Sequence, residues 1–200
     1  MIPRTKNGLP ALGCISAMQK YIRRGMEREA MEFAVELMHT SKQFHTMVCN
    51  RLEIISHEDI DTQADPRIVP FVRAAMDQAR VWYDRDKMGK SRMAVGNAIR
   101  LMSRALKSRE GDHFHVAIGL RSELEGFVPT IPDWAQDMHT IEGKKKGRGL
   151  DHFRQEGAFL DSPPEEPDQY EEEFYRLLAL KNSFKGRSVT TRLGNVRARR

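Results

Sequence analysis

The sequence contains few cysteines, no long apolar run and no phosphate-binding loop, and each absence excludes a class of protein. Cys14 and Cys49 lack the spacing of a metal site, and two cysteines in 200 residues do not form the disulfide framework of a small secreted domain. No apolar stretch approaches the roughly 18–20 residues that cross a bilayer. The first six residues, MIPRTK, lack the apolar block of a secretory signal. We therefore expect buried, reduced thiols and a cytoplasmic protein without membrane attachment.

Motifs of nucleotide hydrolysis and of common catalytic centres are also missing. The chain has no G-x-x-x-x-G-K-[ST], G-x-S-x-G or H-E-x-x-H sequence, so we assign no catalytic residue and no cofactor. His113 and His115 are the best metal candidates, but side chains at i and i+2 diverge on the helix start expected there. We therefore assign no metal ligand. A metal-dependent enzyme acting on nucleic acid or a nucleotide through His113, His115, Glu58 and Asp59 is kept as an alternative.

Positive charge is concentrated at the end of the chain. The formal net charge is +5, although residues 1–180 hold 26 basic and 28 acidic residues. The excess lies in the last twenty residues, which contain seven basic residues and no acidic one: Lys181, Lys185, Arg187, Arg192, Arg197, Arg199 and Arg200. Such a tail is typical of a disordered segment, and it can bind phosphates through counterion release. A tail that only increases solubility is the alternative.

Apolar residues recur at helical spacing over most of the chain, and almost no stretch alternates as a strand does. The pattern predicts a helical hairpin over Cys14–Met38 with a break at Arg23-Arg24-Gly25. It predicts further helices over Phe44–Ile55, Ile68–Tyr83 and Ser91–Leu106, and a weaker one over Val116–Phe127. Asp65 is expected to cap the Ile68 helix, with Pro66 in its first turn. The expected fold class is all-α, a bundle of five or six helices.

The character of the sequence changes from Pro129 onward. Three glycines (143, 147 and 149) surround the basic residues Lys144, Lys145, Lys146 and Arg148. This composition predicts a flexible loop whose ammonium groups and backbone amides approach an anion, with a solvated loop as the alternative. An acidic, proline-rich linker (161–169) and a last helix near 170–180 follow.

Several short motifs resemble one known family. SAMQKYIRRGMEREA (16–30) resembles the start of the C-terminal domain of the RarA/MgsA family, AAA+ ATPases related to clamp loaders and to the Werner-helicase-interacting protein. RLEIISHEDI (51–60), Asp65-Pro66 and ALKSREG (105–111) are similar to later family motifs, with Leu106, His57 and Asp61 as departures. The segment from Asp137 and His139 through Gly143, Lys145, Gly147 and Gly149 resembles the family's closing stretch. The matches occur in order over about 16–153.

The resemblance implies a helical collar that drives tetramerisation, from parent proteins that act at stalled forks and single-strand–duplex junctions. It implies a collar-like domain over 13–160, with an N-terminal extension (1–12) before it. The linker, the last helix and the basic tail (181–200) then follow. The exposed end of the hairpin is expected to present Gln19, Lys20, Arg23 and Arg24. Glu58 and Asp59 are expected to make structural ion pairs. The family's ATPase module is absent from this sequence, so ATP hydrolysis is not carried over.

These observations lead to one main hypothesis. We expect a non-catalytic, self-associating protein of DNA replication or repair, a tetramer by the resemblance, that contacts DNA through the Lys144–Arg148 segment and the basic tail or binds a replication partner. An interaction module for an AAA+ ATPase, without DNA contact, is a further alternative.

Overall fold

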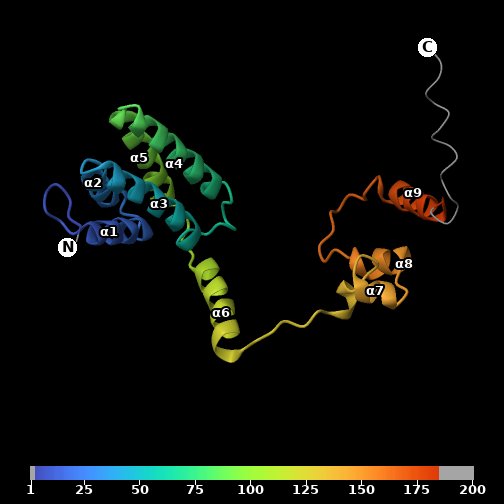
Figure 1. The fold of residues 1–200 in the computed structure, drawn as a ribbon. Coiled ribbons are helices and arrows are strands. Elements are labelled where there is room, and N and C mark those ends of the chain that lie inside the picture. The colour runs from blue at the N-terminus through green and yellow to red at the C-terminus, as the bar shows by residue number, and fades with distance from the viewer. Residues whose placement is uncertain (1–2, 185–200) are drawn as a thin grey trace, which may run out of the picture. The chain divides into compact units, whose positions relative to one another are not determined.

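The computed structural model describes residues 3–184 and has an all-α fold, which confirms the fold class predicted from the sequence (Figure 1). The α-helices are α1 (Ala11–Arg23), α2 (Glu27–Met38), α3 (Lys42–Glu58), α4 (Ile68–Asp84), α5 (Met88–Arg104), α6 (Glu110–Glu125), α7 (Ile141–Lys145), α8 (Leu150–His152) and α9 (Glu171–Phe184). A 3₁₀ turn, η1 (Asp133–Ala135), and a π-helical turn, η2 (Phe153–Gly157), complete the elements. None of the helices within 3–184 is long and apolar enough to cross a membrane.

The chain forms two compact units, Met1–Phe127 and Val128–Arg200. The collar-like domain expected over 13–160 is therefore divided in the structure. The division has a physical reason, because residues 126–132 contain no helix and the core consists of side chains that precede residue 103. A sequence with two prolines at this point, Pro129 and Pro132, does not continue a helix.

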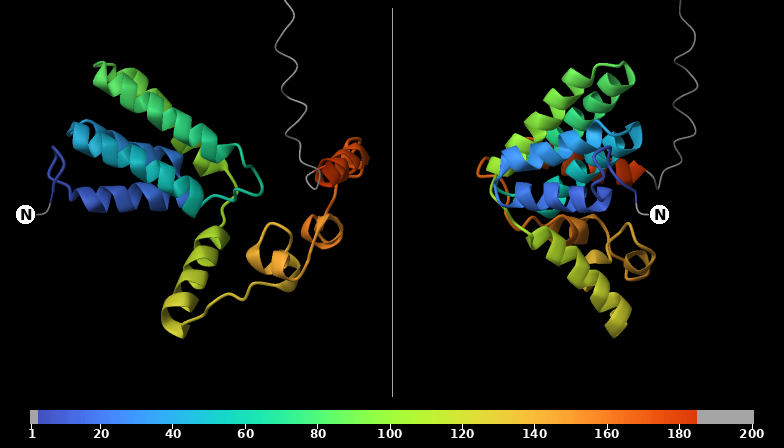
Figure 2. Two further views of the ribbon diagram at one scale, coloured as in Figure 1. Left: turned by 45° about the vertical axis from the view of Figure 1, so that its right-hand side comes forward. Right: turned by 90° about the vertical axis from the view of Figure 1, so that its left-hand side faces the viewer.

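Helices α1 to α5 form the bundle of the first unit. The α1/α2 hairpin packs on α3, α4 packs on α3 and α5, and α5 also packs on α2 (Figure 2). The largest fully buried apolar side chains are Met18, Ile22, Leu37, Met38, Leu52, Ile55, Met76, Ile99 and Met102. Each contributes about 1.5–3 kcal/mol through the apolar area that it removes from water. The helical periodicity in the sequence therefore identifies the core of this unit.

The break in the hairpin depends on Gly25. Its φ of +76° lies in the left-handed region, where a residue with a Cβ is strained. The amide of Gly25 donates to the Ile22 carbonyl at 3.0 Å, and the amide of Met26 donates to the Tyr21 carbonyl at 2.9 Å. These bonds satisfy carbonyl groups at the end of α1, as in other glycine-terminated helices.

The polar side chain of His45 lies within the bundle core, where it contacts a hydroxyl group and an aromatic ring. His45 is 1% exposed, and its Nε2 lies 2.7 Å from the Ser91 hydroxyl, while its ring packs on Tyr83 with centroids 4.2 Å apart. Burial lowers the pKa of His45 to about 4, so the ring is neutral near pH 7. Cys14 and Cys49 are both buried free thiols, as the sequence predicts.

Two local predictions differ from the structure. The helix expected over Val116–Phe127 begins six residues earlier, at Glu110, because Asp112 and Glu110 supply acidic residues to its first turn. Asp65 does not cap α4, which begins at Ile68 without a side-chain cap. The Asp65 carboxylate instead accepts hydrogen bonds from the amide and guanidinium of Arg67, which forms a turn before the helix.

The second unit is described over residues 128–184 and consists of short elements. η1, α7, α8 and η2 lie close together, and η1 contacts η2. Residues 161–169 contain no helix, and α9 extends to Phe184, four residues beyond the predicted end. The residues of the basic tail from 185 onward lie outside the part that the structure describes.

Candidate functional site

The most buried charge in the first unit is Asp59, at the C-terminal end of α3. Its side chain is 0% exposed, and Arg23 at the end of α1 places Nη2 2.9 Å from Oδ1 and 3.1 Å from Oδ2. Gln19 donates from Nε2 to Asp59 Oδ2 and to Glu58 Oε2, each at 2.9 Å. A buried carboxylate requires such partners because its charge is removed from water. We call Gln19, Arg23, Glu58, Asp59 and Arg109 the carboxylate cluster.

Arg109 brings the start of α6 to the same cluster. Its Nη2 lies 3.5 Å from Glu58 Oε1, its Nε lies 3.9 Å from Asp59 Oδ1, and it also pairs with Asp112 in the first turn of α6. The preceding backbone is fixed too, because the amide of Ser108 donates to the Asp59 carbonyl at 3.2 Å. The cluster therefore joins α1, α3 and α6.

Lys107 is the other cation beside this cluster. Its ammonium donates to the carbonyls of Ser103 and Ala105 at 2.9 and 2.6 Å, which are carbonyls that the end of α5 leaves unpaired. Burial lowers the pKa of Lys107, and the Asp59 carboxylate acts in the opposite direction. Lys107 thus terminates α5 and adds positive charge near Asp59.

The four residues expected at the exposed end of the hairpin occupy two different environments. Gln19 is buried at 8% exposure, so its prediction as an exposed residue is wrong, and Arg23 turns toward the carboxylates of α3. Lys20 and Arg24 stay on the surface, where Lys20 donates to Ser16 Oγ and Arg24 to the Lys20 carbonyl. The difference follows from the 3.6-residue period, since residues 19 and 23 lie one turn apart on the face toward α3.

The carboxylate cluster gives a direct stability test. The substitution Asp59→Asn should lower the free energy of unfolding by about 2–4 kcal/mol, because Arg23 and Arg109 then face a neutral amide in place of a buried carboxylate. The adjacent Glu58→Gln is the matched control and should cost less than about 1 kcal/mol, because Glu58 is part-exposed and its charge is screened. Urea unfolding followed by circular dichroism measures both. Equal losses in the two variants would contradict the central role of Asp59.

The Lys/Gly segment of the second unit is not the flexible loop that the sequence predicts. It contains helix α7, whose N-terminus is capped by the Thr140 hydroxyl. Its cations are engaged: Lys145 pairs with Glu142 at 2.7 Å, and Lys146 pairs with Asp133 at 2.7 Å. Arg148 is only 17% exposed, because its guanidinium pairs with the Asp133 carboxylate and donates to the Asp133 and Gln136 carbonyls at 2.6 and 2.9 Å.

The composition of the segment does not reveal these contacts, because Asp133 and Gln136 lie ten to fifteen residues before Lys146 and Arg148 in the sequence. Arg148 and Lys146 lower the pKa of Asp133 to about 2, so this carboxylate stays charged over the whole neutral range. Within residues 3–184, Lys144 is the cation of this segment without an ion pair. The segment therefore offers much less positive charge to an anion than its sequence suggests.

One glycine of this segment is required by a close backbone approach. A Cβ on Gly143 would overlap the Asp137 carbonyl group, so no residue with a side chain fits there without a backbone shift. The Asp137 carboxylate also accepts hydrogen bonds from the amide and ring of His139, which lower the pKa of Asp137. Gly143 thus lets α7 lie against the turn formed by Asp137 and His139.

Alanine substitutions distinguish this glycine from its neighbour. Gly143→Ala should destabilise the second unit by about 1–3 kcal/mol, because the backbone must move to accommodate the methyl group. Gly149→Ala is the control and should have little effect, since nothing lies within 4 Å of its Cβ position and its φ is −114°. Amide hydrogen exchange over residues 133–157 measures local opening. Protection that is unchanged in Gly143→Ala would contradict the close approach.

His113 and His115 lie within α6, on side chains that do not converge. His115 Nε2 is 3.5 Å from Asp112 Oδ1, and the helix places His113 on another face. Across residues 3–184, no group of three or more histidine, cysteine or carboxylate side chains is arranged to hold a metal ion. Glu58 and Asp59, the proposed acid–base pair of the enzyme alternative, are instead paired with Arg23 and Arg109.

The most unusual surface of the first unit is α6, which the sequence predicts only as a weak helix. None of its residues is buried, yet it carries large apolar side chains. Val116 (42% exposed), Leu120 (46%) and Leu124 (78%) follow one another at i+4 along one side of the helix, and we call these three the α6 apolar face. Phe114 (69%) and Ile118 (51%) lie on a different side of the helix, and Phe127 (38%) follows it. The sequence indicates this surface through the number of apolar residues in α6, none of which packs into the bundle core.

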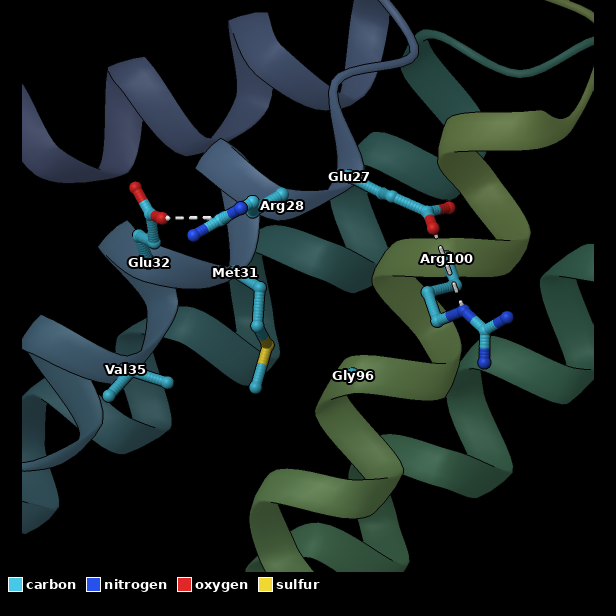
Figure 3. A pocket seen from close by; sticks show the side chains of 7 residues that line it. All are labelled: Glu27, Arg28, Met31, Glu32, Val35, Gly96 and Arg100. Atoms are coloured by element: carbon cyan, nitrogen blue, oxygen red, sulfur yellow. Dashed lines mark hydrogen bonds and ion pairs between the residues drawn. The ribbon is translucent and has the colours of Figure 1, made fainter.

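A groove lies between α2 and α5 in the same unit. Its floor contains Met31, Val35 and Gly96, and its rim consists of charged side chains (Figure 3). The volume is about 540 Å³, and the rim residues are Glu27, Arg28, Glu32 and Arg100. We call it the α2–α5 groove. An apolar floor surrounded by charges is typical of a surface that binds an apolar segment.

The basic tail predicted to bind DNA is placed by the structure only at its first residue. Lys181 is exposed in the last turns of α9. The other members, Lys185, Arg187, Arg192, Arg197, Arg199 and Arg200, lie outside the described residues.

Comparison with known proteins adds no assignment. No family model matches the chain, and no curated protein matches it. The surfaces described above therefore provide the basis for a functional assignment.

Proposed function

We propose that this chain is a non-catalytic, self-associating accessory protein of DNA replication or repair. The observation that supports self-association is the α6 apolar face, in which Val116, Leu120 and Leu124 are 42–78% exposed. Monomeric proteins rarely expose contiguous apolar patches larger than a few hundred Å². A face of this kind gains stability when it is covered, and we propose a second copy of the chain as the partner that covers it.

The role in replication or repair rests on the resemblance to the RarA/MgsA C-terminal domain. In that family the domain is a helical collar that forms tetramers. The all-α fold agrees with a collar, and Arg23, Glu58 and Asp59, which belong to the resembling motifs, are members of the carboxylate cluster. We assign these residues the structural role of fixing α6 on the bundle.

The contact with DNA is assigned mainly to the basic tail. The structured cations of the second unit are mostly paired, as with Lys146 and Arg148 on Asp133. The tail carries positive charge without any acidic residue, which favours phosphate binding through counterion release. Binding of this kind does not depend on base sequence.

Light scattering tests self-association. The unaltered chain should have a mass that is a multiple of 23 kDa at micromolar concentration, with four copies as the expected number. Leu120→Glu should reduce the mass to that of a monomer, because a buried charge opposes covering of the α6 apolar face. Ile54→Glu on α3 is the matched control, since Ile54 (47%) and Leu120 (46%) are equally exposed. A strictly monomeric unaltered chain would exclude self-association.

Salt-dependent binding tests the contact with DNA. Deleting residues 185–200 removes six basic residues and leaves every described residue in place. Affinity for duplex DNA should fall for all base sequences alike, and the slope of log K against log salt should fall by about 0.9 for each phosphate that the tail no longer neutralises. Lys144→Ala, which removes the unpaired cation of the α7 segment, should have a much smaller effect. Unchanged affinity after deletion, at about 50 mM salt, would exclude the tail as the contact. No binding by the unaltered chain would instead favour a protein that binds an AAA+ ATPase without DNA.

A further inference from the structure

The α2–α5 groove is kept open by a glycine in the interior of a helix. Gly96 lies in the middle of α5, where glycine costs roughly 1 kcal/mol relative to alanine. Close packing does not require it, because a Cβ at this position would meet only the Met31 Cε and Sδ atoms at 3.7 and 3.8 Å. Any larger side chain at residue 96 would enter the groove, toward which Met31 points (Figure 3). Gly96 therefore preserves space that bundle packing leaves unfilled.

The α6 apolar face has the form of a segment that fills such a space. Val116, Leu120 and Leu124 follow one another at spacings of four residues, so they form a continuous apolar line along α6. Helices that bind in grooves use anchors at this spacing. The groove volume of about 540 Å³ is large enough for several side chains of this size.

We propose that α6 of one copy of the chain lies in the α2–α5 groove of a second copy. This inference rests on the self-association proposed above and specifies its geometry. Two different surfaces meet, so every copy offers one α6 and one groove. An interface of this heterologous type closes into a ring when the rotation between copies permits, which is the symmetry of a tetrameric collar.

The charges on the two surfaces support this pairing. Glu27 is held by Arg104 through two hydrogen bonds of 2.7 Å, whereas Arg100 lies 3.7 Å from Glu27 and so keeps donors for another carboxylate. Glu123 flanks the apolar line of α6 and has no ion pair within residues 3–184. We therefore place Glu123 of one copy beside Arg100 of the other copy when α6 lies in the groove.

The opposite rim is complementary in the same way. Glu32 on α2 is 64% exposed and makes a single contact of 3.3 Å with Arg28. Arg121 lies on the other side of the apolar line, where its Nε is 3.6 Å from Glu125. An arginine beside Glu32 and a glutamate beside Arg100 fix the direction in which the helix lies in the groove.

A second copy is favoured over the chain's own α6 because the start of α6 is fixed. Arg109 pairs with Glu58 and with Asp112, and the Ser108 amide bonds to the Asp59 carbonyl. These contacts hold the first turn of α6 against the end of α3, from which the helix leaves the bundle (Figure 1). If α6 bound the groove of its own copy, these contacts would have to break.

Complementary variants test the proposal in the full-length chain. Gly96→Phe places a ring in the middle of the groove and keeps α6 intact, while Leu120→Glu disables α6 and keeps the groove. Each variant alone should be monomeric, with self-association weakened at least about 100-fold. An equimolar mixture should give a complex of two copies, one of each variant, because one intact groove receives one intact α6. Gly96→Ala is the control and should assemble normally, since its methyl group fits beside Met31.

Cross-linking identifies the contact itself. A copy with Met31→Cys and a copy with Leu120→Cys should cross-link to each other through a short bis-maleimide, because the native Cys14 and Cys49 are buried. Leu120→Cys alone should not form a linked pair. The same mixture with Gly96→Phe added to the Met31→Cys copy should lose the cross-link.

The outcomes separate this inference from the proposed function. If Gly96→Phe assembles like the unaltered chain while Leu120→Glu does not, the groove is not the site and α6 pairs with another surface, so self-association stands and the inference fails. A cross-link confined to one chain carrying both cysteines would overturn the second-copy assignment. If the unaltered chain is monomeric, both proposals fail.

Discussion

The arrangement of the first unit depends on one ion pair, between the partly exposed Arg23 and the fully buried Asp59. Asp59 is fully buried, so its negative charge must be compensated within the protein, and Arg23, Gln19 and Arg109 supply that compensation from α1 and from the start of α6. The hairpin, the end of α3 and the start of α6 are thereby held together. The interaction is structural, but it also determines which surface is exposed, because it fixes the point from which α6 begins.

The two surfaces that the bundle leaves unused then become the features with functional meaning. The α6 apolar face is exposed because α6 contributes no side chain to the core, and the α2–α5 groove exists because Gly96 carries no side chain. Neither feature improves the stability of an isolated copy. In the proposed self-association both surfaces are covered when two copies meet, which removes apolar area from water.

The distribution of charge differs between the described residues of the second unit and the sequence of the tail. In the second unit, Asp133 pairs with Lys146 and Arg148, and Glu142 pairs with Lys145, so lysines that look like an anion site in the sequence serve local folding. The tail has no acidic residues with which to do the same. This difference in composition is the reason for assigning DNA contact to the tail, because a basic segment without acidic residues favours phosphate binding through counterion release.

The sequence by itself determined the all-α class, the hairpin with its break at Gly25 and most of the bundle core, because helical periodicity and a left-handed glycine are local properties. It also indicated that Glu58 and Asp59 meet basic neighbours. Only the tertiary structure decided that Gln19 is buried, that Arg148 binds Asp133 and that Gly143 touches the Asp137 carbonyl. These contacts join residues whose side chains or backbones become neighbours through folding, and no local pattern records such neighbours. The groove beside Gly96 belongs to the same class, since it is formed by two helices about sixty residues apart.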